Sequence, residues 1–147
     1  MKRQQGFSLI ELLIVVAVIG IIAAIAVPNL MRSRDAAQEA SAISSLRTLA
    51  TAQITYSATQ GNGQFTDLGT LNGAGLIDEA LAAGLKDGYQ FTLGGDADDF
   101  SFNANPTGPN SAMMRWFYVD TSCVIRFENG TAAGPASTPL GGQVAAP

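Results

Sequence analysis

Carboxylates are the residues with the clearest chemical potential in this chain. Histidine is absent from the 147 residues and cysteine occurs once, at Cys123, which excludes a histidine-based triad, a histidine-ligated metal and an intramolecular disulfide. Asp96, Asp98 and Asp99 form an acidic cluster with the hard oxygen ligands that calcium prefers. A solvated hairpin turn is the simpler interpretation, which we favour. We therefore expect no cofactor, with calcium as a weak candidate.

Glu11 is the other notable carboxylate, because it lies in an apolar stretch that runs from Phe7 to Val27 and is otherwise interrupted only by Ser8. As a helix this stretch would be about 32 Å long at ~1.5 Å per residue, which matches the ~30 Å core of a bilayer. A buried carboxylate there costs about 2.5–3.5 kcal/mol at mid-bilayer and less near an edge. If this helix stays on the mature chain, Glu11 needs a positively charged partner.

The rest of the chain has a different character. Only two of the 16 glycines, Gly6 and Gly20, precede residue 61, and only one of the six prolines, Pro28, lies in the first 60 residues. We therefore predict a long helix for the residues before 61 and turns with short strands for the residues that follow. The formal net charge of −4 argues against nucleic acid as a partner of this chain alone.

Three interpretations of the N-terminus are open from the residues alone. Lys2 and Arg3, the apolar stretch and the small residues of Ala24-Ile25-Ala26 resemble a secretory signal peptide. An ordinary membrane anchor has the same length and composition. Glu11 favours a third interpretation, a retained helix that finds a partner, because a signal peptide discarded on cleavage has no use for a carboxylate.

The segment Lys2-Arg3-Gln4-Gln5-Gly6, followed by Phe7-Ser8-Leu9-Ile10-Glu11-Leu12, resembles the leader and cleavage site of type IV prepilins and type II secretion pseudopilins. The resemblance implies cleavage of the Gly6–Phe7 bond by a membrane-embedded prepilin peptidase, which also N-methylates Phe7. The apolar helix then stays on the mature chain. Glu11 would neutralise the new α-amino group of a neighbouring copy, so that neither charge is isolated in hydrocarbon.

The resemblance also implies an α+β, ladle-like fold. We expect a leader at 1–6, a transmembrane and filament-core helix at 7–29 and its amphipathic continuation at 30–60. A head at 61–129 and a flexible tail at 130–147 would follow. The head would pack a three- or four-stranded antiparallel sheet on the amphipathic half. We predict a short helix at 78–85 and strands at 89–93, 100–103, 115–120 and 123–127, with Cys123 buried in the last.

Gly20 and Pro28 predict flexibility in the apolar helix. Pro28 lacks an N–H group and should kink the helix, and the resemblance implies that helical order can be lost between these residues in a filament. Beyond Pro28 an apolar stripe at helical spacing predicts the face that covers the sheet: Ala36, Ala40, Ile43, Leu46, Ala50 and Ile54.

The expected function is structural and not enzymatic. The resemblance implies a subunit of a type IV pilus-like filament, inserted once in the inner membrane with its head in the periplasm. Its expected partners are copies of itself, the peptidase, an assembly platform protein and ATPase, and the bilayer before assembly. Within the family the alternative is a type II secretion pseudopilin in a periplasmic pseudopilus. A more distant alternative is a secreted soluble domain with a conventional signal peptide.

Overall fold

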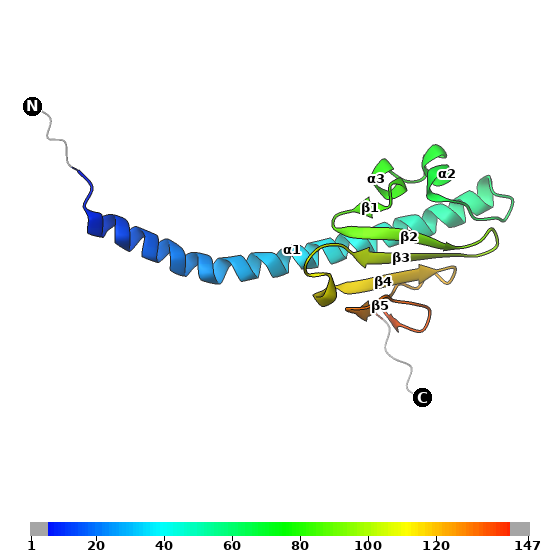
Figure 1. Cartoon of the computed structure of the whole chain (residues 1–147). Helices are drawn as coiled ribbons and strands as arrows, with labels where there is room; N and C mark the ends of the chain where they lie inside the picture. The colour runs from blue at the N-terminus through cyan, green and yellow to red at the C-terminus, as the bar shows by residue number, and fades with distance from the viewer. Residues whose placement is uncertain (1–5, 142–147) are drawn as a thin grey trace, which may run out of the picture. The chain divides into compact units, whose positions relative to one another are not determined.

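The computed structural model describes residues 6–141, and the chain divides into two units, residues 1–36 and 37–147. One helix, α1 (Leu9–Thr59), begins in the first unit and ends in the second. The two units are described in turn, and Figure 1 shows the order of the elements along the chain.

The first unit is the apolar part of α1. The helix continues without a break across Gly20 and Pro28. Because Pro28 has no N–H group, the carbonyl of Ala24 lacks its usual intrahelical donor at this point. The predicted loss of order between Gly20 and Pro28 concerns an assembled filament and stays a prediction.

The second unit is an α+β head in which the rest of α1 covers a single sheet. The predicted stripe on α1 is right at Leu46 and Ala50, which are buried, whereas Ala36, Ala40 and Ile54 are exposed. The buried face is rotated from the predicted one. It consists of Ala42, Ser45, Leu46, Leu49, Ala50, Ala52 and Gln53.

Two short helices and a short strand connect α1 to the main sheet. The helices are α2 (Leu68–Gly73) and α3 (Glu79–Ala82), and each begins after an aspartate whose side chain accepts a backbone N–H. Asp67 accepts from Thr70 N at 3.0 Å and Asp78 accepts from Leu81 N at 2.8 Å, which is ordinary N-capping. The helix predicted at 78–85 is therefore present but shorter.

The sheet has six strands in the order β1-β2-β3-β4-β5-β6, all antiparallel, where three or four were predicted. They are β1 (Leu85–Lys86), β2 (Tyr89–Gly95), β3 (Phe100–Pro106), β4 (Arg115–Asp120), β5 (Arg126–Asn129) and β6 (Thr138–Pro139). A short 3₁₀ helix, η1 (Ser111–Met113), precedes β4. The inner residues of β2, β3 and β4 are aromatic or aliphatic, and they meet the buried face of α1 in one core.

Cys123 is exposed and lies in a turn, so its predicted burial in a strand is wrong. Asp120 Oδ1 accepts from Ser122 N at 2.9 Å, and Asp120 O accepts from Cys123 N at 2.8 Å. Cys123 consequently has a positive φ of 57°, which a strand does not allow. The side-chain bonds of Asp120 outcompete the strand propensity of the next residues, and β5 begins only at Arg126.

The segment expected to be a flexible tail makes regular contacts where the structure describes it. Strand β6 pairs with β5, and Leu140 N donates to Ile125 O at 2.7 Å. Ala133 is buried, and its carbonyl accepts from Asn103 Nδ2 at 2.8 Å. Residues 142–147, the end of the predicted tail, lie outside the described residues.

Candidate functional site

The candidate site is the beginning of α1, where the sequence predicts processing and assembly. Gly6 and Phe7 precede the helix, and Phe7 is 81% exposed. A Cβ built on Gly6 would meet no atom within 4 Å. A larger residue at this position would therefore cause no steric clash within the chain. If glycine is required there, the requirement comes from a protein that binds this segment.

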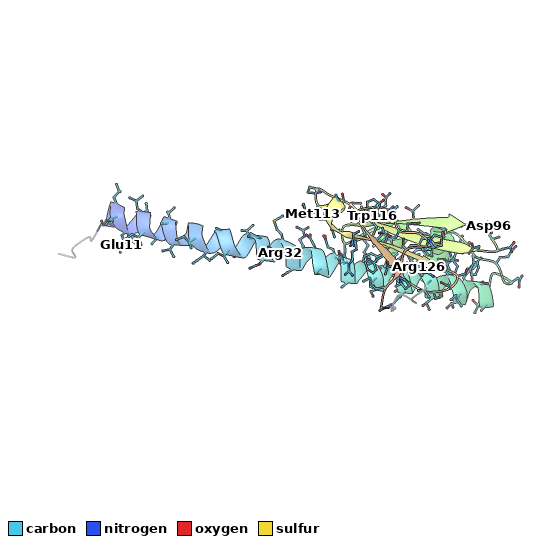
Figure 2. The ribbon with its side chains drawn as sticks, turned by 90° about the horizontal axis from the view of Figure 1, so that it is seen from below. Glu11, Arg32, Asp96, Met113, Trp116 and Arg126 are labelled. Atoms are coloured by element: carbon cyan, nitrogen blue, oxygen red, sulfur yellow. The ribbon has the colours of Figure 1, made fainter. Side chains whose placement is uncertain are left out.

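Glu11 lies in the first turn of α1 and is exposed (Figure 2). The free N–H groups of a first turn carry partial positive charge and favour an anion there. Phe7 and Ser8 precede α1; in a mature helix that extended back to Phe7, four residues would separate Phe7 from Glu11 by about 6 Å along the axis. Among residues 6–141 the ion pairs are Lys86–Asp78 and Arg115–Glu39, so Glu11 has no ion-pair partner there.

The surface that follows Glu11 is apolar on all sides. Every large apolar side chain from Phe7 to Met31 is at least 47% exposed. The helix is long and apolar enough to cross a membrane. A soluble monomer does not leave such an area in water, so lipid or other polypeptide must cover it.

Gly20 lies within this surface, and a Cβ added to it would meet no atom within 4 Å. No packing inside the chain therefore requires glycine at this position. Gly20 lowers the helix propensity by about 1 kcal/mol relative to alanine, and Pro28 removes one hydrogen bond from the ladder. Both residues weaken the same part of α1.

The aspartate cluster of the head forms a hairpin turn between β2 and β3. Asp96 Oδ1 accepts from Asp98 N at 3.0 Å, and Asp96 N donates to Asp99 O at 3.0 Å. Asp96, which Figure 2 labels, is exposed. Among the described residues no group of three or more His, Cys, Asp or Glu side chains is placed to hold a metal ion. The turn bonds thus account for the cluster, and calcium binding is untested.

Sequence reasoning missed the ion pair that fastens α1 to the sheet. Glu39 Oε1 accepts from Arg115 N at 3.0 Å, and Glu39 Oε2 accepts from Arg115 Nε at 2.8 Å and lies 2.6 Å from Nη2. The guanidinium also lies over the rings of Phe117 and Phe127, at 5.6 and 5.4 Å. The partners are 76 residues apart, and no local spacing signals such a pair.

Gln53 was missed in the same way. It is fully buried on α1, its Nε2 donates to Thr66 O at 2.5 Å and its Oε1 accepts from Thr66 N at 3.1 Å. The two bonds satisfy both backbone groups of Thr66 as the chain turns back after α1. The one available signal was position, because Gln53 follows Leu46 and Leu49 at helical spacing.

Comparison with known proteins gives one family model and several relatives. The prokaryotic N-terminal methylation motif matches residues 1–27. The type IV major pilin protein PilA of Myxococcus xanthus is 48% identical over 54 residues, which is 37% of this chain and 24% of that protein. A fimbrial protein of Pseudomonas aeruginosa is 42% identical over 88 residues, or 51% of this chain and 57% of the relative.

The type II secretion system core protein G of Aeromonas hydrophila is 38% identical over 55 residues, 37% of this chain and 38% of that protein. The chain thus spans between about a quarter and somewhat over half of the length of these relatives. No solved structure matches it. The matched motif overlaps the exposed apolar helix, and over part of its length the chain is similar to type IV pilins and to type II secretion core G proteins.

Proposed function

We propose that this chain is the structural subunit of a type IV pilus-like filament. It is inserted once in the inner membrane with its head in the periplasm. A prepilin peptidase cleaves the Gly6–Phe7 bond and methylates the new terminus at Phe7. The mature chain is then polymerised by an assembly ATPase and platform protein. In this role the chain is a substrate and a building block, and not an enzyme.

The observation that carries the proposal is the exposed apolar part of α1, most of which lies within the matched methylation motif at residues 1–27. One surface serves two purposes, because lipid covers it before assembly and other copies cover it afterwards. Glu11 then has a role at each stage. It lies near the membrane edge at first, and in the filament it neutralises the α-amino group of a neighbouring Phe7.

The matches to type II secretion core G proteins support a second assignment, a pseudopilus subunit. Both assignments require the same processing and the same helix. They differ in where the polymer is found. Long fibres at the cell surface support the pilus, whereas loss of protein secretion without surface fibres, on deletion of the chain, supports the pseudopilus.

The substitution Glu11→Val tests the polymerisation step. Valine lowers the cost of membrane insertion, so the variant should insert and be cleaved like the wild type. It should yield at least tenfold less sheared filament, because the neighbouring α-amino group loses its counter-charge. Filament yield equal to that of the wild type would refute the pairing of Glu11 with Phe7.

A further inference from the structure

We propose that Arg32 of one copy pairs with Asp35 of the neighbouring copy, as a second intersubunit ion pair that forms at the same axial stagger as the pair between Phe7 and Glu11. This proposal rests on the function proposed above and deepens it. It assigns to the distal end of the apolar helix a contact that fixes the register of the assembly.

The first step is the stagger. The proposal takes the mature helix to extend back to Phe7, two residues before the start of α1 at Leu9. If the α-amino group of Phe7 on one copy is then level with Glu11 of its neighbour, the two helices are displaced by four residues, or about 6 Å. Every residue of the displaced copy is then level with the residue four positions later on its neighbour. Arg32 of the displaced copy falls at the level of residue 36, within about 1.5 Å of the level of Asp35.

The second step is that both partners are available. Arg32 is exposed and Asp35 is half-buried, and neither belongs to the two ion pairs found among residues 6–141. Within one helix the order Arg then Asp is the unfavourable one for a side-chain pair, because it opposes the helix dipole. The two charges gain more from a second copy than from each other. Figure 2 shows Arg32 on the same helix as Glu11.

The third step is that the order of charges is the same in both pairs. In both pairs the cation lies three or four residues before the anion in the sequence. The same axial displacement between neighbouring helices therefore brings the two members of each pair to the same level. Around an ideal helix Glu11 and Asp35 lie about 120° apart. Pro28 lies between them and removes one hydrogen bond from the helix, so the proposal includes a change of helical phase at Pro28 on assembly that turns both carboxylates toward the same neighbour.

Arg34 is the matched control for this argument. At the same stagger it is level with Gln38, which carries no charge. The nearest acid, Glu39, is bound through both oxygens by Arg115. Reversal of the charge at residue 34 therefore changes the same helix by the same chemistry without removing a partner.

Charge reversal in the full chain tests the proposal. Arg32→Glu and Asp35→Arg should each lower the yield of sheared filaments at least tenfold, while the cleaved chain accumulates in the membrane as in the wild type. The double variant restores the pair with reversed polarity and should recover to within twofold of the wild type. Arg34→Glu should also stay within twofold.

Single reversals that assemble like the wild type, or a double variant that assembles no better than the single ones, would overturn the proposal. Failure of the wild-type chain to polymerise at all would instead overturn the proposed function. The cleaved chain in the membrane fraction separates these results from a failure to fold.

Disulfide cross-linking gives a second measurement that does not depend on reversed charge. In a Cys123→Ser background, a tagged Arg32→Cys chain and an untagged Asp35→Cys chain are co-expressed and oxidised in the filament. A mixed dimer is expected, and each chain alone should remain a monomer. Absence of the mixed dimer from assembled filaments would contradict the level match.

Discussion

Glu39→Ala should loosen the attachment of α1 to the sheet. Glu39 accepts two hydrogen bonds from Arg115 and lies in ion-pair contact with its guanidinium, and its side chain is only 15% exposed. A hydrogen bond to a charged group contributes about 1.5–3 kcal/mol, and loss of one partner leaves the other unpaired. Because the Arg115 side chain is 36% exposed, water compensates part of the loss. We expect a destabilisation of about 2–3 kcal/mol, or a fall in Tm of about 10 °C.

Trp116 makes this measurement direct. It is the only tryptophan and lies next to Arg115 on β4, so its fluorescence reports unfolding of the head. The full chain in detergent micelles is unfolded with urea, and Glu39→Gln should lose about half as much because the amide oxygen still accepts from Arg115 N. Arg47→Gln, at an exposed position of α1, is the control and should change stability by less than about 0.5 kcal/mol. An unchanged midpoint for Glu39→Ala would refute the reasoning.

Three further outcomes are expected. Gly6→Val should leave an uncut precursor in the membrane, visible by its mass, although nothing in the chain contacts that position; normal processing would exclude this cleavage site. Gln53→Leu should destabilise the head by about 2–3 kcal/mol in the same urea assay, because both backbone groups of Thr66 lose their partners, and a wild-type midpoint would contradict it. Hydrogen bonds from Lys86 to Asp78 and from Thr70 to Asp67 lower the pKa of each carboxyl below its usual value of 3.8. The stability that these groups add is therefore present above pH 3.8 and lost as the pH falls through their folded pKa values; Asp78→Asn should flatten this acid limb, and an unchanged limb would show that Asp78 does not contribute to it.

Local sequence patterns predict best the strands that have high β propensity and are bounded by turn residues. The strand predicted at 115–120 coincides with β4, and the strands predicted at 89–93 and 100–103 form the first parts of β2 and β3. Alternating aromatic and polar residues have only one way to place their apolar side on a core. Strands β1 and β6 have two residues each and no such alternation, so they depend on neighbours that a sequence does not reveal.

The functional residues also divide into those with a local sequence signal and those that meet only in the folded structure. Gly6, Phe7 and Glu11 could be proposed from the sequence because their spacing is local and is joined to a long apolar helix, and their roles stay predictions. The fastening of the head was missed because Glu39 and Arg115 meet only after the sheet has formed. Cys123 was misplaced because the side chain of Asp120 outcompetes strand propensity, an effect that depends on turn geometry and not on hydrophobic pattern.

Analysis of the mature N-terminus tests the central claim most directly. Mass spectrometry of the chain purified from its native membrane or filament reads both the cleavage site and the modification. We predict that the chain begins at Phe7 and that its α-amino group carries one methyl group. A terminus at Val27, after the apolar stretch, would contradict the account, because the helix that forms the filament core would then have been removed.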